Sequence, residues 1–207
     1  MKKTIYGVLA FAVLTFTACG NDEAKEETAE VAVAGGEYVL SPKENDLTWT
    51  GSWTGGESDG KTHTGTISIT EGSIVVDGDT YEGNFVIDMN SIINTDIEDE
   101  TYNGKLVGHL KSDDFLNTEK FPTTKVKIEA EGTDKAYLVI SAFDMAFKQG
   151  APIKATITAD HVILAGEFSL ELPKATMPGL QEDPEAPENG SVSSEVTFVL
   201  NVKLDKK

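Results

Sequence analysis

Apolar and polar residues alternate along most of this chain, and this period of two restricts its fold more than any other feature. The clearest runs are Thr66–Thr70, Tyr81–Met89 and Val196–Leu204, the last of which is the longest. Successive side chains of a β-strand point to opposite faces, so each run predicts a strand with one apolar face. In the second run, Phe85 and Ile87 lie on that face.

Turn residues separate these runs. Glu71-Gly72 predicts a turn, and Asp77-Gly78-Asp79 predicts a tight hairpin of the Asp-Gly kind. Further strands are expected at the other alternating sets, which are Leu47–Trp53, Val126–Ile128, Leu138–Ala142, Ile153–Ala159 and Phe168–Leu172. Many short strands joined by Gly and Asp turns predict an all-β fold, either an antiparallel barrel or a sandwich.

One stretch departs from the period of two. Between Thr101 and Lys111, Tyr102, Leu106 and Leu110 recur at helical spacing, after an acidic run that favours the positive end of a helix. We therefore expect one short helix that crosses between strands. A sandwich needs no such plug, so the helix favours the barrel.

The single cysteine, Cys19, stands where a lipid anchor would be attached. Residues 1–18 combine a positive start, an apolar run from Ile5 to Phe16 and small residues before the cysteine, which are the parts of a secretory signal peptide. A cysteine at the cut resembles the lipobox of bacterial lipoproteins, although Phe16 stands where leucine is usual. The apolar run is shorter than the roughly 20 residues that span a bilayer.

These features predict an extracytoplasmic lipoprotein, anchored in the cell envelope by acyl chains on Cys19 and facing the periplasm or the cell surface. An accidental cysteine in a plain signal peptide is the alternative. Residues 19–36 contain no aromatic residue and are expected to form a flexible acidic tether, which leaves residues 37–207 as one domain. The acidic group between Asp22 and Glu27 resembles an export signal for the cell surface, or it is only a solvated linker.

A second segment without alternation runs from Pro173 to Gly190 and contains four prolines and several acidic residues. Loops of this length in a compact domain are usually functional or disordered. We expect this loop at one end of the barrel, and we favour a solvated flap over a lid.

The charge of the chain excludes some partners. The net charge is −18 and the sequence contains no arginine. Such an acidic surface repels nucleic acid. Arginine is the usual clamp for phosphate and carboxylate, so an anionic headgroup would have to be held by lysine, backbone N–H groups or hydroxyls, or stay in solvent.

Four motifs occur in order along the predicted strands. They are the turn at Lys61–Thr66, the strand end at Gly83–Ile92, the His-Leu-Lys-Ser-Asp-Asp-Phe helix end within Lys105–Phe115, and the Phe-Pro-Thr turn within Glu119–Thr124. This ordered series resembles the YceI-like family of bacterial envelope proteins, and the resemblance as a whole covers most of residues 38–204. Two departures, at Phe143–Pro152 and at Leu172-Pro173-Lys174 where the family has an arginine, affect the expected rim and lining of a barrel.

The resemblance implies a lipocalin-like fold, an elongated antiparallel eight-stranded β-barrel with one short crossover helix. It also implies an apolar interior, in which some family members hold a long isoprenoid or fatty-acid-derived chain. An eight-stranded barrel can take one small ligand or be filled by its own side chains. Burying a long chain contributes about 0.8 kcal/mol per CH₂, so such a ligand needs no charged clamp.

Apolar residues of the predicted strands are the candidates for ligand binding, and we expect about half of them to touch a ligand if a tunnel exists. They are Trp49, Trp53, Phe85, Ile87, Met89, Phe115, Phe143, Phe147, Phe168, Leu170 and Phe198. A structural role in the family motif is expected for His109, Leu110, Asp113, Phe115 and Pro122.

No chemistry is predicted for the polar residues. His109, Asp113 and Asp114 lie near one another in the sequence, but a metal site needs several converging ligands, and a turn cap explains Ser112-Asp113-Asp114. There is no nucleophile elbow, phosphate-binding glycine loop or dinucleotide fingerprint. We therefore predict no catalytic residue, no metal ligand and no cofactor.

The leading functional hypothesis is a non-catalytic envelope lipoprotein that carries or stores a long amphipathic lipid, isoprenoid or fatty-acid-like, in its barrel. Its expected partners are that lipid and the membrane, while no protein partner is identified. One alternative is a protein-interaction module that uses the acidic surface or the Pro173–Gly190 loop. Another is a surface lipoprotein that binds carbohydrate through Trp49 and Trp53.

Overall fold

The computed structural model describes residues 35–42 and 45–207, which belong to one compact unit. Cys19, the predicted signal peptide at residues 1–18 and nearly all of the predicted tether at residues 19–36 lie outside the described residues. Within the described part, no helix is long and apolar enough to cross a membrane.

Strands dominate the described residues. They are β1 (Gly36–Leu40), β2 (Asp46–Thr54), β3 (Thr62–Asp77), β4 (Thr80–Asp88), β5 (Ile93–Asn94), β6 (Thr123–Glu131), β7 (Ala136–Ala142), β8 (Met145–Ala151), β9 (Ile153–Ile157), β10 (His161–Glu171) and β11 (Ser191–Lys206). The helices are α1 (Glu100–Lys111) and the short 3₁₀ turns η1 (Gly56–Ser58), η2 (Met89–Ser91), η3 (Lys174–Thr176), η4 (Pro178–Leu180) and η5 (Pro187–Asn189).

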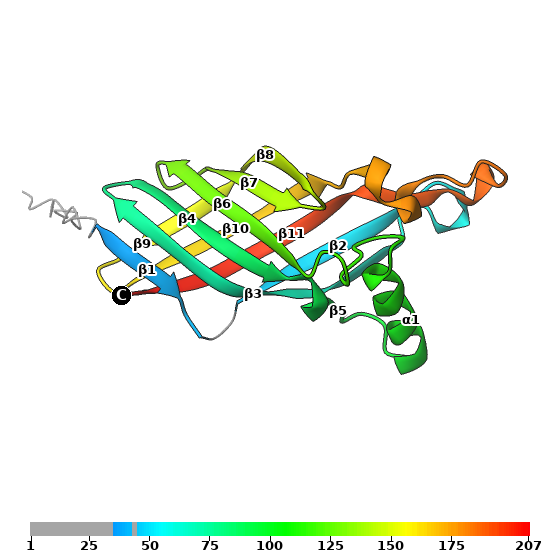
Figure 1. Ribbon diagram of the computed structural model, residues 1–207, viewed down its shortest axis with the longest axis horizontal. Coiled ribbons are helices and arrows are strands. Elements are labelled where there is room, and N and C mark those ends of the chain that lie inside the picture. Colours follow the sequence, from blue (N-terminus) through cyan, green and yellow to red (C-terminus); the bar gives the residue numbers. More distant parts are fainter. Residues whose placement is uncertain (1–34, 43–44) are drawn as a thin grey trace, which may run out of the picture. The chain divides into compact units, whose positions relative to one another are not determined.

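The strands form one antiparallel sheet that closes into a barrel (Figure 1). The order along the sheet is β8-β7-β6-β4-β3-β1-β11-β10-β9, and β1 and β2 share the place between β3 and β11. β8 and β9 are the two ends of this order, yet only Pro152 separates them in the chain, so this broken strand completes the circuit. With each broken strand counted once and the short β5 left aside, the barrel has the predicted eight positions, although its strands number eleven.

The predicted turn at Glu71-Gly72 is wrong, because β3 continues through it. The pairing of β3 with β4 shifts register between Ile69 and Glu71, which is the signature of a β-bulge. A Cβ atom on Gly72 would lie 2.5 Å from the ring of Phe85 on β4. Glycine therefore lets the strand bend close to that ring without ending. The predicted hairpin is confirmed, since Asp77 pairs with Thr80 and Gly78 has a φ of 64°.

The predicted helix is confirmed, but it does not plug the barrel. The Asp99 carboxylate caps α1 by accepting hydrogen bonds from the backbone N–H groups of Thr101 (2.9 Å) and Tyr102 (3.0 Å). None of the residues of α1 is fully buried, and Tyr102 is 63% exposed. The helix lies against the outside of the barrel (Figure 1), where only its last turn, at Leu110, reaches the interior.

Candidate functional site

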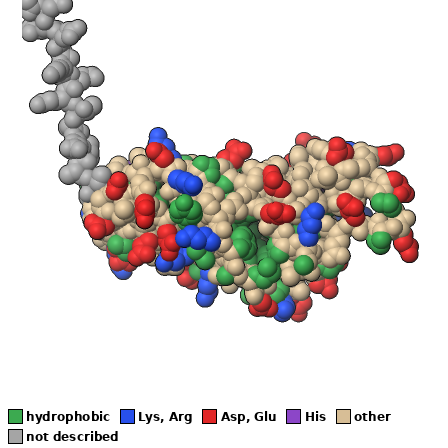
Figure 2. All heavy atoms as spheres, turned by 90° about the horizontal axis from the view of Figure 1, so that it is seen from above, with side chains coloured by type: hydrophobic (Ala, Val, Ile, Leu, Met, Phe, Trp, Pro, Cys, Tyr) green, Lys and Arg blue, Asp and Glu red, His purple; other side chains and the backbone are tan. Residues whose placement is uncertain are grey.

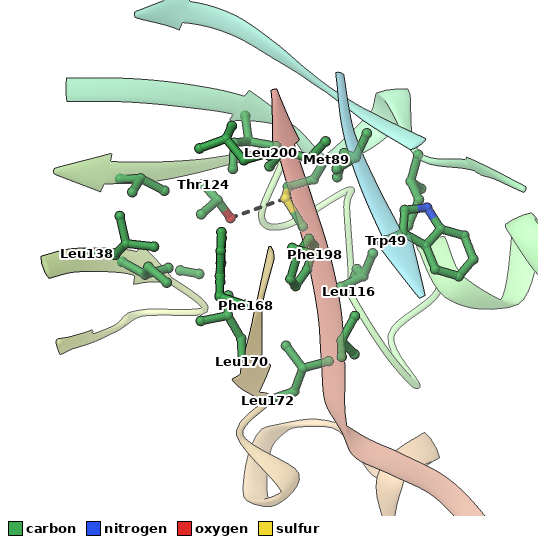
Figure 3. Close-up of a pocket in the computed structure, with 18 of the residues that line it drawn as sticks. Trp49, Met89, Leu116, Thr124, Leu138, Phe168, Leu170, Leu172, Phe198 and Leu200 are labelled. Carbon is green, nitrogen blue, oxygen red and sulfur yellow. Dashed lines mark hydrogen bonds between the residues drawn. The ribbon is translucent and has the colours of Figure 1, made fainter. Parts of the chain in front are cut away.

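The barrel encloses a cavity of about 210 Å³ (Figure 3). Side chains from β2, β3, β4, β6, β7, β8, β9, β10 and β11 line it, so its wall draws on the whole circuit of strands. An engineered apolar cavity of about 150 Å³ is already large enough to bind benzene. The barrel is therefore not filled by its own side chains.

The wall of the cavity is apolar throughout. Hydrophobic side chains supply all of the lining except Gly51, Thr124 and Ser193, and no polar atom is exposed in the wall. The Thr124 hydroxyl is turned to the Met89 sulfur at 3.2 Å and donates a hydrogen bond to it (Figure 3). Such a wall can recognise a ligand by shape and apolar surface, but it offers the ligand no hydrogen bond.

One end of the cavity is open. Leu116, Phe143, Phe147 and Leu172 are only half-buried there, whereas the strand residues at the other end are fully buried. On the face seen in Figure 2, hydrophobic side chains gather around a hollow. We call this open end, defined by those four residues, the mouth.

Part of the Pro173–Gly190 loop covers the mouth, which corrects the expectation of a solvated flap. Met177 and Leu180 are 0% and 2% exposed and form a small core with Phe115, while Leu180 also lines the cavity. The Gly179 N–H donates to the Asp114 carbonyl at 2.8 Å. Its missing side chain matters, because a Cβ atom on Gly179 would lie 2.4 Å from the Phe115 ring. The η3–η4 half of the loop is thus a lid, whereas most of the Gln181–Gly190 half is exposed.

The barrel wall is also incomplete beside the mouth. Among the described strands, β8 pairs with β7, and residues Glu167–Glu171 of β10 pair with β11, but β8 and this part of β10 share no backbone ladder. The side-chain amide of Gln149 bridges this seam by donating to the Ser169 carbonyl. The mouth therefore extends sideways along a seam that has one side-chain hydrogen bond rather than a ladder.

The β7–β8 turn at the mouth is strained. Phe143 and Asp144 have φ angles of 55° and 58°, a left-handed conformation that costs a non-glycine residue roughly 1–3 kcal/mol. Contacts with the segment between α1 and β6 hold the turn. The Phe121 and Phe143 rings meet edge to face at 5.6 Å, and Lys120 pairs with Asp144 at 3.3 Å. The ion pair is exposed, so the aromatic contact is the stronger restraint.

The structure brings ten of the predicted ligand-binding residues together in the cavity wall. These are Trp49, Phe85, Ile87, Met89, Phe115, Phe143, Phe147, Phe168, Leu170 and Phe198. Contact of any of them with a ligand stays a prediction. Trp53 is the exception, because it does not line the cavity and its indole N–H donates instead to the Asn189 carbonyl at 3.0 Å.

Sequence reasoning missed many aliphatic wall residues. Leu47, Ile67, Leu138, Leu164 and Leu200 line the cavity as closely as the aromatic residues do. The signal was present, since each of them lies on the inward face of an alternating strand. Favouring aromatic side chains obscured it.

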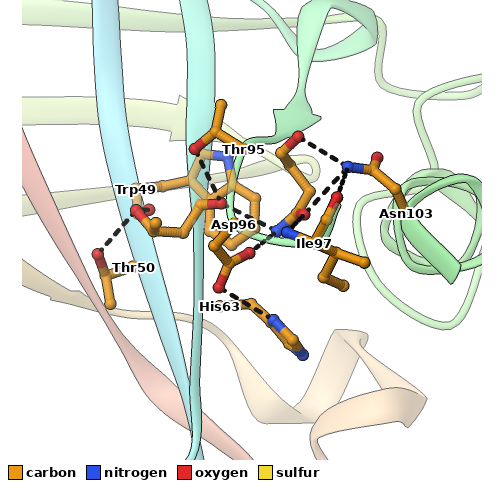
Figure 4. A network of polar contacts seen from close by, with 9 residues as sticks. Trp49, Thr50, His63, Thr95, Asp96, Ile97 and Asn103 are labelled. Carbon is orange, nitrogen blue, oxygen red and sulfur yellow. Dashed lines mark hydrogen bonds and ion pairs between the residues drawn. The ribbon is translucent and has the colours of Figure 1, made fainter. Parts of the chain in front are cut away.

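A polar network fixes one side of the wall from outside (Figure 4). The Trp49 indole N–H donates to the Ile93 carbonyl at 3.2 Å, which ties β2 to β5. Asn94 of β5 donates to the Thr64 carbonyl at 2.9 Å, and Asn103 of α1 donates to the Asn94 carbonyl at 3.1 Å. Helix α1 therefore helps to hold the Trp49 ring in the cavity wall.

Asp96 completes this network. Its carboxylate accepts hydrogen bonds from the Asn94 amide and from His63, whose Nδ1 lies 3.2 Å from Oδ2. Burial alone would raise the pKa of Asp96, but these hydrogen bonds and the nearby imidazole lower it below its usual value. The site is half-open to solvent and structural in character.

The remaining polar candidates have structural partners. Ser112 ends α1 by donating its hydroxyl to the His109 carbonyl at 2.8 Å, and His109 Nε2 lies 3.1 Å from Asp114. The Pro122 carbonyl accepts from the Met89 N–H at 2.9 Å, and Leu110 lines the cavity. Asp113 is exposed. Within the described residues, no three His, Cys, Asp or Glu side chains are placed to hold a metal ion.

The barrel is also found in a solved structure. BcnA of Burkholderia cenocepacia is similar with a TM-score of 0.54 and 13% identity, over 79% of this chain and 98% of that one. A mutant CJ YCEI protein with a monobromobimane guest has a TM-score of 0.45 and 10% identity, over 68% of this chain and 84% of that one. No curated protein matches the sequence. At 13% identity, the likeness to BcnA shows the fold alone.

The sequence itself assigns the family. The YceI-like domain matches residues 38–204, which is nearly all of the described barrel. This agrees with the motif series from Lys61 to Thr124 and with the lipocalin-like architecture predicted from it. The YceI-like fold is that of a binding protein. The chain belongs to the YceI-like domain family.

Proposed function

We propose that this protein binds one long, chain-shaped apolar lipid, of the isoprenoid or fatty-acid-like class, inside its barrel. The observation that carries the proposal is the cavity itself, which is open at one end, closed at the other and apolar over its whole wall. Each CH₂ group that moves from water into such a wall contributes about 0.8 kcal/mol. A chain of many CH₂ groups therefore binds without any polar contact.

The polar end of the ligand stays at the mouth. No polar atom is exposed inside the cavity, so a headgroup drawn inward would lose its hydrogen bonds to water without replacement. At the mouth, the headgroup remains in solvent beside Lys120, Asp144 and the lid. The chain enters tail first, and the protein acts as a non-catalytic carrier or store.

The proposed place of action is the cell envelope. Acyl chains on Cys19 would hold the barrel near a membrane, which is both a source and a destination for such lipids. This part of the proposal rests on the sequence of residues 1–19. The carbohydrate-binding alternative loses support, because Trp49 is only 6% exposed and lies in the cavity wall rather than on the outer surface.

A pair of tryptophan variants tests the proposal. Ala142, at the end of β7, lines the cavity, so Ala142→Trp places an indole in the void. Val75 is 54% exposed, so Val75→Trp adds the same side chain outside the barrel. Protein purified from cells is extracted with organic solvent, and the lipid per protein is measured by mass spectrometry.

We expect the native protein and Val75→Trp to carry a chain-shaped lipid at equal stoichiometry. Ala142→Trp should carry at least tenfold less lipid per protein. Thermal unfolding checks that both variants are folded. Equal lipid on both variants, or no lipid on the native protein even after incubation with fatty alcohols, contradicts the proposal.

A further inference from the structure

The closed end of the barrel determines how deep a chain can reach. Antiparallel register allows the inward-facing residues to be followed down each strand. On β10, Leu164 lines the cavity and Val162, two residues closer to the closed end, does not. On β11, Val202 lines it and Leu204 does not. The cavity therefore ends one layer of side chains below Leu164 and Val202.

Tyr81 is the largest side chain of that layer on β4. Phe85, Gly83 and Tyr81 follow one another on the inward face of β4 and are all buried. Phe85 lines the cavity, Gly83 has no side chain, and Tyr81 lies outside the lining at 3% exposure. The Ile74 side chain of β3 pairs with Gly83, fills the space that the glycine leaves, and is fully buried outside the lining. A chain passing Phe85 would therefore meet Ile74 together with the Tyr81 ring.

Small residues on the neighbouring strands leave space for this ring. Tyr81 pairs directly with Ala130 of β6, and Ala136, Ala151 and Ala155 are the buried residues at the same end of β7, β8 and β9. Four methyl groups cannot close the barrel on that side. The bulk on that side comes from Tyr81 of β4, while Ile74, Val162 and Leu204 close the rest of this end.

The Tyr81 hydroxyl has no role in holding the ring. It is buried and has no hydrogen-bond partner among the described residues. Tyr38, the other tyrosine at this end, differs, because its hydroxyl donates to the Thr158 carbonyl at 3.0 Å and ties β1 to the turn between β9 and β10. Tyr81 fills space, and a phenylalanine would fill it equally well.

We infer that Tyr81, with Ile74 beside it, forms the floor of the cavity on the β4 side and limits the longest chain that the barrel accepts in full. The inference rests on the proposed lipid binding and adds to it a specificity-determining residue. Chains shorter than the cavity gain affinity with each CH₂, by about fourfold per group. Chains that reach Tyr81 gain nothing further, because additional CH₂ groups stay in solvent at the mouth.

A length series tests this inference. The probe is a set of straight-chain saturated fatty alcohols of increasing length, bound one at a time to delipidated protein. The native protein should gain about fourfold in affinity per CH₂ up to a limiting length and then reach a plateau. In Tyr81→Ala the plateau should begin at a chain several CH₂ groups longer than in the native protein. Tyr81→Leu is a smaller truncation that is less apt to impair folding, and its plateau should shift in the same direction by fewer CH₂ groups.

Two further variants complete the design. Tyr81→Phe keeps the ring and should keep the native limit. Ile128→Phe enlarges a residue of the cavity wall two positions from Ala130 and should shorten the limit. If the limiting chain length of the native protein is unchanged in both Tyr81→Leu and Tyr81→Ala, the floor is elsewhere and the inference is overturned. If the native protein binds no alcohol of any length, the proposed function fails as well.

Discussion

At the scale of single residues, Tyr81 links the depth of the cavity to the stability of the fold. Its phenol is buried without a partner among the described residues, and this burial raises its pKa from 10.0 to about 12. A buried hydroxyl without a hydrogen bond costs about 1–3 kcal/mol. A position that only needed to be filled would be more stable with phenylalanine.

The first residue-scale prediction is a dependence of stability on alkaline pH. The phenol of the unfolded chain ionises near its ordinary pKa of 10.0, whereas the folded Tyr81 stays protonated up to about 12. This contribution to stability is complete below pH 10 and is lost as the pH rises to about 12. The two units of pKa correspond to at most about 2.7 kcal/mol.

Urea unfolding of the native protein and Tyr81→Phe, followed between about pH 9 and about pH 12, measures the effect. The native protein should lose up to about 2.7 kcal/mol more than the variant over this range. At neutral pH the variant should be at least as stable as the native protein. Parallel pH profiles would show that the Tyr81 phenol ionises as easily in the folded protein as in the unfolded chain, and so is not buried in solution.

Trp49 and Trp53 show how far sequence reasoning reaches at this scale. Their spacing places both on one face of a strand, and Trp49 indeed lines the cavity. The pairing of β2 with β11, however, shifts register between Val192 and Val196, and Trp53 binds Asn189 in the Pro173–Gly190 loop. A bulge and a contact with a distant loop are tertiary features that the local alternation does not contain.

At the scale of elements, β5 is the shortest strand of the sheet but holds part of the cavity wall. It pairs antiparallel with β3, and Asn94 lies opposite Gly65. A Cβ atom added to Gly65 would lie 1.8 Å from the Ile93 carbonyl oxygen and 2.7 Å from the Trp49 ring. The close approach allows the Trp49 indole to donate to that carbonyl. The close approach of β5, and not the backbone conformation, requires glycine at position 65, since the φ of Gly65 is not in the left-handed region.

The second stability prediction follows from this contact. Gly65→Ala should separate β5 from β3, break the Trp49–Ile93 hydrogen bond and lower the free energy of unfolding by about 3 kcal/mol or more. Gly51→Ala on β2 is the matched control, because nothing lies within 4 Å of its added Cβ atom. Chemical denaturation compares the two.

Gly51→Ala should remain within about 1 kcal/mol of the native protein. Tryptophan fluorescence adds a second readout, since Trp49 should become more exposed in Gly65→Ala alone. Equal stability of the two variants would mean that β5 is not pressed against β3 in solution.

Element boundaries were predictable where local chemistry decides them. The Asp-Gly hairpin at Gly78 and the cap of α1 at Asp99 follow from turn and capping preferences. The turn expected at Glu71-Gly72 did not form, because Phe85 on the neighbouring strand needs the space above Gly72. The helix expected as a plug lies outside, since only Leu110 at its end reaches the cavity wall. Both errors concern what an element packs against.

At the scale of the whole molecule, the sequence predicts a barrel but leaves open whether the barrel is hollow or filled by its own side chains. Alternation in strands from β2 to β11 and the family motifs were sufficient for the architecture. The cavity depends on the sum of side-chain volumes at each level of the barrel, with alanines at Ala130 and Ala136 and a tyrosine at Tyr81. Those sums require the register between strands, which one sequence does not supply.

The charge of the molecule acts at the same scale. A net charge of −18 without arginine leaves little to attract an anionic headgroup. The ion pair between Lys120 and Asp144 already engages one lysine near the mouth. The affinity of the proposed ligand therefore comes from its chain, and it should respond to chain length far more than to salt.

The most direct test of the central claim is the position of a chain end inside the barrel. A long saturated alcohol with bromine at its terminal carbon is bound to the protein, and the anomalous scattering of bromine is measured in crystals. The account predicts a bromine peak inside the barrel near Ile128 and Leu164, above Tyr81, with the hydroxyl at the mouth near Phe143. A bromine peak only outside the barrel, or a cavity closed by its own side chains, would contradict it.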